Sequence, residues 1–284
     1  ASDLANRLNP KFERINTRDG LSQSTVNTIM QDSFGIMWIG TSEGLNRYDG
    51  KVFEQFYNRS SDPSSLSHDY VAEVIEDPQG NIWVGADGGL NSFDRISASF
   101  QLVDFEKLPR GTDPGESAIR SLFIDKSGAL WIGTERGLVK RNEDGSFTHY
   151  RHDPMDRGTI GLGAVRAIAQ DLQGNMWIGS EVSGLSRLNP ANGRIDRYQG
   201  GLGQSDRPDN SIRDMIIGPA GALYVATFNG GLWEVDTQDL KFKSIPLYSS
   251  EGKPVVRTRS LLVDQASRLW VGSDNGVFLI DLNT

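Results

Sequence analysis

The sequence has 284 residues with a formal net charge of −8, 37% hydrophobic residues and no cysteine. The acidic balance argues against nonspecific binding to nucleic acid, and the lack of cysteine excludes a disulfide framework and a thiolate metal site. No run of 18 apolar residues is present to span a membrane, and we expect no signal peptide in the chain.

A single motif recurs six times along the chain. Its first copy runs from Asp32 to Thr41, with an Asp-x-x-Gly turn followed by Trp-Ile-Gly-Thr. The aromatic residues that anchor the six copies are Trp38, Trp83, Trp131, Trp177, Tyr224 and Trp270. They are spaced by about 46 residues, a period that is typical of repeat architectures. We interpret the five tryptophans as packing residues of the repeat.

Each copy predicts four short strands and no helix. In the first copy a β-rich run at residues 26–30 leads through the Asp–Gly turn into the strand that holds the tryptophan. A Gly-Leu pair opens a third strand at 45–48, and a fourth follows at 53–56. No stretch shows the apolar spacing of a surface helix. Four short strands per repeat form one blade of a β-propeller, so the fold class is all-β.

The chain is predicted to form one propeller domain over residues 1–284. The six blades are expected at residues 26–57, 71–105, 119–150, 165–198, 212–246 and 258–282. The sixth copy ends after its third strand, while residues 12–15 near the N-terminus resemble the fourth strands elsewhere. We therefore expect residues 11–16 to pair with the last blade and close the ring, which would remove an open sheet edge. The alternative is a truncated seven-bladed propeller.

Long loops are expected to gather at one end of the ring. The connections between successive blades are the long ones, at residues 58–70, 106–118, 151–164, 199–211 and 247–257. In propellers these loops lie around the central channel, together with the loops between the second and third strands. Long loops on a rigid scaffold are where binding usually resides, so we expect a ligand site at this channel mouth.

A column of arginines marks the same end. Eleven residues before the anchoring aromatics stand Asn27, Ala72, Arg120, Arg166, Arg213 and Arg259. Guanidinium groups match carboxylate, sulfate or phosphate, so four neighbouring arginines predict an anion-recognition sector. A structural alternative competes with this hypothesis. The acidic residues that follow the aromatics by four positions, Asp87, Glu135, Glu181 and Asp274, could pair with the arginines in a ladder between blades.

Three further residues are candidates for ligand contact. Trp233 is out of register with the repeat and follows an unusual loop at 228–231, so its ring could stack on a sugar or cover a blade edge. His68 and Tyr70 stand where the first long loop enters the second blade, near the channel or in a solvated loop. The common hydrolase, metalloprotease and P-loop motifs are absent, so we predict no catalytic residue, metal or cofactor.

The motif resembles a known family. Residues 26–50, with Trp38-Ile39-Gly40-Thr41 and Gly44-Leu45-Asn46-Arg47-Tyr48-Asp49-Gly50, closely resemble the two-component regulator propeller repeat, and residues 71–94 match equally well. The opening residues 12–22 resemble the start of such sensors. The fifth copy departs most, because Gly218, Tyr224 and Ala226 stand in place of Asp, Trp and Gly.

The resemblance implies the periplasmic sensor domain of an inner-membrane receptor with histidine kinase or diguanylate cyclase output. It implies an oligosaccharide-binding domain that is followed by downstream domains of the same chain. The arginine column adds the expectation of another small anionic ligand as an alternative, and the missing catalytic motifs and the composition predict a non-enzymatic domain that makes no membrane or nucleic-acid contact itself. The resemblance also allows a homodimer of the full receptor.

Two alternatives to the sensor stay open. A propeller lyase of the streptogramin-lyase type would need a histidine base and a metal in the channel, and only His68 could serve as that base. A protein-interaction scaffold would show an exposed apolar patch on one face.

Overall fold

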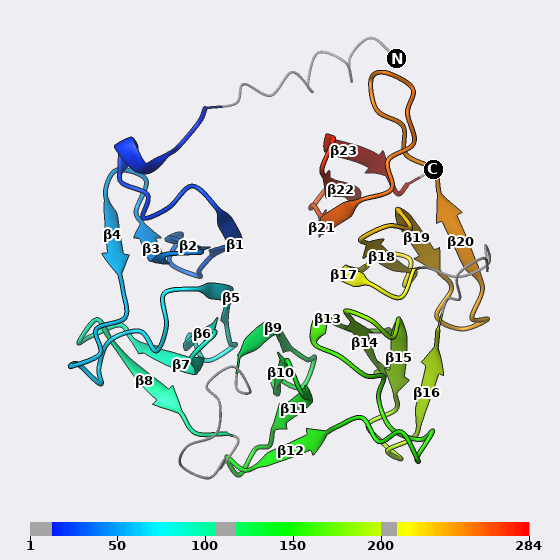
Figure 1. Cartoon of the computed structure of the whole chain (residues 1–284), viewed down its shortest axis with the longest axis horizontal. Helices are drawn as coiled ribbons and strands as arrows, with labels where there is room; N and C mark the ends of the chain where they lie inside the picture. Colours follow the sequence, from blue (N-terminus) through cyan, green and yellow to red (C-terminus); the bar gives the residue numbers. More distant parts are fainter. Residues whose placement is uncertain (1–12, 106–117, 200–208, 284) are drawn as a thin grey trace.

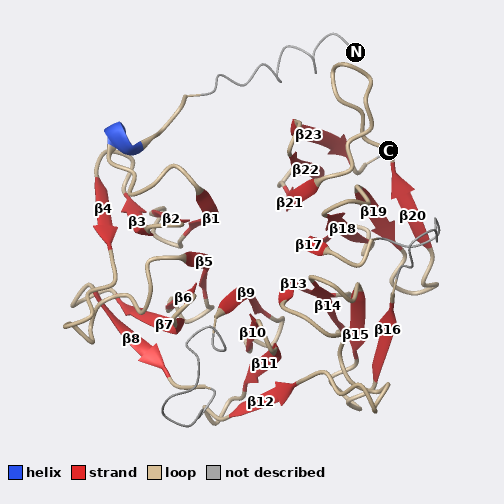
Figure 2. Cartoon of the chain, viewed as in Figure 1, coloured by secondary structure: helices blue, strands red, loops and turns tan. Residues whose placement is uncertain are grey.

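The computed structural model describes residues 13–105, 118–199 and 209–283 as a ring of six antiparallel sheets around a common axis (Figure 1). In each sheet the first strand lies nearest the axis, and the later strands follow in sequence order toward the rim. The only helix of the described part is a single 3-10 turn, η1 (Thr17–Asp19) (Figure 2). The described residues thus contain no helix that is long and apolar enough to cross a membrane. The all-β propeller of six radial sheets is thereby confirmed.

The strands fall into the six blades predicted from the repeat. Blades 1 and 2 contain β1 (Val26–Gln31), β2 (Met37–Thr41), β3 (Gly44–Tyr48), β4 (Phe53–Phe56), β5 (Val71–Glu76), β6 (Ile82–Ala86), β7 (Gly89–Asp94) and β8 (Ser99–Val103). Blades 3 and 4 contain β9 (Ile119–Ile124), β10 (Leu130–Thr134), β11 (Gly137–Arg141), β12 (Phe147–Tyr150), β13 (Val165–Gln170), β14 (Met176–Ser180), β15 (Leu185–Leu188) and β16 (Ile195–Tyr198). Blades 5 and 6 contain β17 (Ile212–Ile217), β18 (Leu223–Thr227), β19 (Leu232–Val235), β20 (Phe242–Ile245), β21 (Thr258–Val263), β22 (Arg268–Ser273) and β23 (Gly276–Asp281).

The conserved spacing of Asp, Gly and Trp within the chain builds one turn. The Asp32 carboxylate accepts the backbone N–H groups of Phe34 and Ile36 at 3.0 and 2.9 Å, and the indole N–H of Trp38 at 2.9 Å. Gly35 adopts a φ of 83°, in the left-handed region that glycine tolerates best. The same carboxylate–indole bond joins Asp77 to Trp83, Asp125 to Trp131, Asp171 to Trp177 and Asp264 to Trp270.

Neighbouring blades pack face to face because a glycine follows the aromatic by two residues. A Cβ added to Gly40 would lie 2.6 Å from Val71 in the first strand of blade 2, and one added to Gly179 would lie 2.5 Å from Ile212 of blade 5. The missing side chain lets the next blade approach, and Trp38 then meets Phe93 of blade 2 edge-on at 4.9 Å. The hydrophobic core therefore lies between blades, in clusters that each join two neighbours.

The expected closure of the ring is not what the structure shows. The sixth sheet has only the three strands β21, β22 and β23, and residues 13–16 form no strand, so the predicted pairing is wrong for them. Residues 11 and 12 of the predicted closing strand lie outside the described residues. Blades 1 and 6 consequently remain apart (Figure 1).

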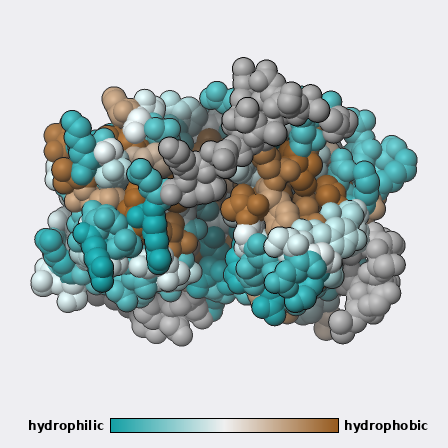
Figure 3. All heavy atoms as spheres, turned by 90° about the horizontal axis from the view of Figure 1, so that it is seen from above, coloured by the Kyte–Doolittle hydropathy of each residue, from teal (hydrophilic) through white to brown (hydrophobic). Residues whose placement is uncertain are grey.

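The two blade faces beside this gap keep the apolar side chains that other blades bury. Ile29 of blade 1 is 60% exposed, whereas Val74 at the same position of blade 2 is 1% exposed. Val277 of blade 6 is 64% exposed, whereas its equivalent Leu90 is fully buried. Figure 3, which views the molecule from this side, shows hydrophobic surface on both halves. The alternative of a truncated seven-bladed ring stays a prediction.

Candidate functional site

The four arginines of the column lie at the beginning of the innermost strands β9, β13, β17 and β21. Each follows the first residue of its strand, at the point where the pairing with the second strand shifts register. The extra residue at such a β-bulge is not paired with the neighbouring strand, so its side chain can point in a different direction from that of a regular strand residue. The contacts of these arginines place them beside the loops that connect the second and third strands, at the channel mouth.

Three of the four arginines pair with the predicted carboxylates, but of these three only Arg120 links two blades as the ladder hypothesis expected. Arg120 of blade 3 binds Asp87 of blade 2 and Glu135 of its own blade. Burial by itself would lower the pKa of Arg120, but the hydrogen bonds to these two carboxylates raise it above its ordinary value. The other two pairs are Arg166 with Glu181, at 2.8 Å, and Arg259 with Asp274.

Arg213 is the exception. Its nearest carboxylate is Glu181 at 3.7 Å, and that group already accepts two hydrogen bonds from Arg166. The Nε of Arg213 is buried and has no hydrogen-bond partner among the residues that the structure describes. Burial lowers the pKa of Arg213 below its ordinary value, and the neighbouring charges of Arg166 and Arg259 add to this.

An aromatic ring brings a second arginine to Arg213. The guanidinium of Arg213 lies 4.6 Å from the ring centroid of Phe228, and that of Arg257 lies 4.9 Å from the same ring. Arg257 is also 3.7 Å from Asp274, which Arg259 already engages. We call Arg213, Phe228 and Arg257 the Phe228 cluster. The cluster joins blade 5 to the loop that leads into blade 6. Its two positive charges have only Glu181 and Asp274 as neighbouring carboxylates, each at 3.7 Å and each already paired with another arginine.

The remaining sequence candidates have structural partners. His68 accepts the backbone N–H of Tyr70 through Nδ1 at 3.0 Å, which fixes the loop before β5. Tyr70 lies under the Arg120 guanidinium, 5.9 Å from ring centroid to Cζ. Trp233 is only 6% exposed and donates its indole N–H to the Gly230 carbonyl at 2.8 Å. It packs in the core between blades 4 and 5, so the expectation of a ligand-stacking ring is corrected to a packing role.

Two half-buried carboxylates stand one position beyond the arginine column, on opposite sides of the ring. Glu73 on β5 accepts the Thr28 hydroxyl at 2.7 Å, and Asp214 on β17 accepts the backbone N–H of Leu261 at 2.7 Å. Burial raises the pKa of Glu73 to about 7, with a further contribution from the charge of Asp214, and burial raises the pKa of Asp214 to about 6. No group of three or more His, Cys, Asp or Glu arranged to hold a metal occurs in the described ranges.

Sequence reasoning found the ladder but missed two members of the Phe228 cluster. Arg257 stands two residues outside the repeat position of Arg259, so the column did not contain it. Phe228 belongs to the loop at 228–231, which departs from the repeat just before Trp233. The unusual sequence of that loop was therefore the one signal in the repeat alignment that pointed to the cluster.

Comparison with known proteins gives the repeat a family. The family described as "Two component regulator propeller" matches residues 20–43, 65–88 and 114–136, which include the turns and second strands of blades 1 to 3. Over 61 residues, 22% of this chain, the sequence is 43% identical to histidine kinase P4 of Formosa agariphila, and this segment spans 4% of that protein.

Solved structures share the fold. The extracellular domain of a B. thetaiotaomicron protein described as the hybrid two-component system BT3049 matches 95% of this chain with a TM-score of 0.79 and 24% identity. Virginiamycin B lyase of Staphylococcus aureus matches 92% of this chain and 81% of its own, with a TM-score of 0.64 and 14% identity. The chain spans 35% of the BT3049 domain, and likeness at these identities shows the fold alone. Three of the six repeats of this chain thus match the two-component regulator propeller family, and the six radial blades show that the repeats fold as a propeller.

Proposed function

We propose that this chain is the ligand-sensing propeller of a bacterial signal-transduction receptor and that it acts outside the cytoplasm by binding rather than by catalysis. The two-component regulator propeller repeats support this function. The fold of an extracellular receptor domain, shared over 95% of the chain, is consistent with it. In the full receptor, downstream domains of the same chain would carry the signal onward.

The ligand site that we propose is the Phe228 cluster. The observation that carries it is the buried Nε of Arg213, which has no acceptor in the described part of the chain. A buried N–H group without a partner costs about 1–3 kcal/mol, so an oxygen atom supplied by a ligand would recover that free energy. A carboxylate or sulfate fits best, because it can bridge the guanidinium groups of Arg213 and Arg257. An acidic oligosaccharide carries such groups.

The position of the cluster offers a way to transmit binding. Arg213 and Phe228 belong to blade 5, whereas Arg257 precedes the first strand of blade 6, the blade at the open end of the ring. An anion held between them would favour arrangements in which the two blades lie close at the channel mouth. A ligand shifts the equilibrium between two arrangements only if it binds one of them more tightly than the other. Contacts that bridge blades 5 and 6 provide this difference in affinity.

A calorimetric titration tests the proposal. Oligogalacturonate and sulfated oligosaccharides are expected to bind, and neutral oligosaccharides of the same length are expected to bind at least tenfold more weakly. Arg213→Gln removes a charge-assisted hydrogen bond of about 1.5–3 kcal/mol and should weaken binding roughly 10- to 100-fold.

The matched control is Arg47→Gln on the outer side of blade 1, where Arg47 pairs with Glu54 at 3.2 Å. This control should bind like the parent protein. Equal affinity of the Arg213→Gln and parent proteins for an acidic ligand would refute the site. The lyase alternative draws on shared fold alone, and tight binding of a divalent metal that is lost in His68→Ala would favour it instead.

A further inference from the structure

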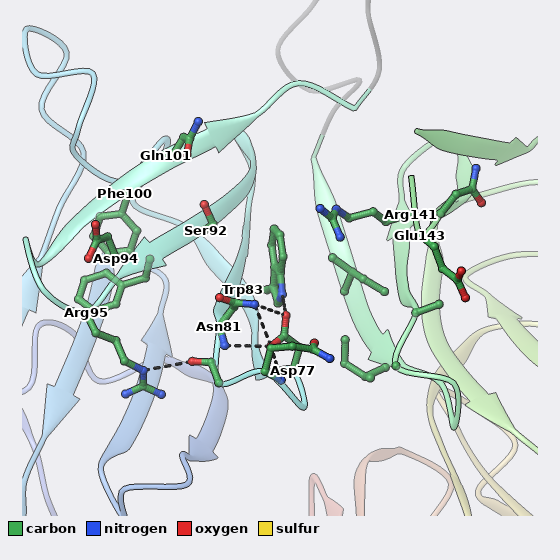
Figure 4. A pocket seen from close by; sticks show the side chains of 18 of the residues that line it. Asp77, Asn81, Trp83, Ser92, Asp94, Arg95, Phe100, Gln101, Arg141 and Glu143 are labelled. Atoms are coloured by element: carbon green, nitrogen blue, oxygen red, sulfur yellow. Dashed lines mark hydrogen bonds between the residues drawn. The ribbon is translucent and has the colours of Figure 1, made fainter. Parts of the chain in front are cut away.

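A concave site lies between blades 2 and 3, away from the channel mouth. It is a groove of about 970 Å³ lined by the turns after β5 and β9 and by the turns after β7 and β11 (Figure 4). Arg120 is the second residue of β9, whereas Ile124 at the other end of that strand lines the groove. The groove and the arginine column therefore occupy opposite ends of the propeller.

One departure from the repeat opens this groove. The residues that pair across the strand from the anchoring aromatics are Arg47, Ser92, Lys140, Arg187, Glu234 and Leu279. Five of them are long, and Lys140 and Arg187 lie over their tryptophans at 5.3 and 5.8 Å. Ser92 is the single short side chain, so Trp83 has no comparable cover from its own blade.

A second departure places a charge where the other blades have an apolar side chain. The equivalent residues at the end of the third strands are Tyr48, Phe93, Arg141, Leu188, Val235 and Ile280. Phe93 packs on Trp38 of the preceding blade at 4.9 Å. Arg141 takes the corresponding place beside Trp83, with its guanidinium 5.6 Å from the ring centroid, and reaches toward the cavity (Figure 4).

Five charged residues line the groove, and three of them, Asp77, Asp94 and Arg95, have hydrogen-bond partners in the structure. The Asp77 carboxylate accepts the indole N–H of Trp83 and the amide of Asn81, both at 2.8 Å. Arg95 binds Asp32 at 2.7 Å and Glu76 at 2.8 Å. The Arg141 side chain makes no hydrogen bond or ion pair with any residue that the structure describes. Its contact with Trp83 leaves its fork of N–H donors unused.

We propose that this groove is a second ligand site, for a small ring-containing molecule that carries a carboxylate. The carboxylate binds the guanidinium of Arg141, which matches it with two parallel hydrogen bonds. The ring of the ligand lies in the space that Ser92 leaves beside Trp83. A groove of this volume accommodates one to a few rings. The site is independent of the Phe228 cluster, and neither proposal needs the other.

The indole N–H resonance of Trp83 reports directly on this groove. In two-dimensional NMR spectra of the nitrogen-15-labelled protein, the resonance is assigned by its loss in Trp83→Phe. D-glucuronate represents sugar acids and phenylacetate represents aromatic acids, while D-glucose is the uncharged control. We expect saturable shifts of the Trp83 resonance with one or both acids and none with glucose. The acid that binds more tightly identifies the source of the carboxylate.

Two substitutions separate binding from folding. Arg141→Leu restores the apolar contact found in the other blades, so it should abolish the shift and raise the melting temperature. Ser92→Arg supplies the long side chain found in blades 1 and 4, so it should fill the groove and abolish the shift while Arg141 remains. The matched control, Arg187→Gln, alters an arginine that already pairs with Asp196 at 3.3 Å, and it should leave the shift unchanged.

Three results would overturn this proposal. The first is a Trp83 resonance that neither acid moves at about 10 mM, a concentration above the dissociation constant of even a weak site. The second is an unchanged shift in Arg141→Leu. The third is an unchanged shift in a Ser92→Arg variant that melts at the same temperature as the parent protein. This result would overturn the proposal even if Arg141→Leu lowered the stability of the protein. Loss of binding at the Phe228 cluster alone would not affect the groove.

Discussion

At the scale of single residues, one carboxylate organises the turn in five of the six blades. Asp171 is buried and accepts the backbone N–H groups of Gln173 and Asn175 together with the indole N–H of Trp177. It therefore fixes the turn and the orientation of the core aromatic at once. The fifth copy changes both partners together: Gly218 has no carboxylate, and Tyr224 has no indole N–H that would need one.

Removal of that carboxylate should be costly. Asp171→Ala leaves a buried indole N–H and two turn N–H groups without their acceptor, so we expect a loss of about 2–4 kcal/mol in the free energy of unfolding. Urea denaturation measures it. Glu54→Ala, which breaks an exposed ion pair on the rim of blade 1, is the control and should cost less than about 1 kcal/mol. Similar losses in the two variants would contradict the role assigned to the turn.

At the scale of the blades, stability comes from packing between neighbours. Ile29 and Ile168 occupy the same position of the first strand in blades 1 and 4, nine residues before the anchoring tryptophan. Ile168 is buried against the neighbouring blade, whereas Ile29 faces the gap between blades 1 and 6. The same residue type thus contributes differently because one copy has a neighbour on that side and the other has none.

This matched pair tests the open ring. Ile168→Ala should lower the free energy of unfolding by about 2–5 kcal/mol, because it creates a cavity in a packed interface. Ile29→Ala should change it by less than about 1 kcal/mol, because the side chain is largely exposed already. Chemical denaturation of both variants gives the comparison. Equal losses would mean that the face of blade 1 is covered in solution.

The repeat predicted the strands closely because each strand is encoded within its own copy. The first strand of blade 3 begins at Ile119 and ends at Ile124, as the pattern indicated. The ladder of Arg120 with Asp87 and Glu135 was likewise predictable, because both partners recur at fixed positions. The Phe228 cluster and the Arg141 groove were not, because they depend on side chains from neighbouring copies that break the period.

At the scale of the whole molecule, two half-buried carboxylates lie on opposite sides of the ring. Glu73 lies in blade 2 and Asp214 in blade 5, and the charge of Asp214 contributes to the raised pKa of Glu73. Both folded-state pKa values, about 7 and about 6, lie above the ordinary values of 4.5 and 3.8. The protonated forms are therefore favoured by folding, and the stability that they confer is lost as the pH rises.

The pH dependence of unfolding follows from these shifts. The contribution is fully present below about pH 4 and disappears as the pH rises through 6 and 7. We expect the free energy of unfolding to fall between pH 5 and pH 8, and Glu73→Gln to remove roughly 2–3 kcal/mol of that fall. Urea denaturation at several pH values measures both. A variant with the same pH profile as the parent protein would contradict the assignment to Glu73.

The most direct test of the sensing account is a crystal structure of the protein with an acidic oligosaccharide. We predict a carboxylate or sulfate oxygen about 3 Å from Nε of Arg213, with the same anionic group in contact with Arg257. A ligand that binds elsewhere and leaves this Nε without an acceptor would contradict the account.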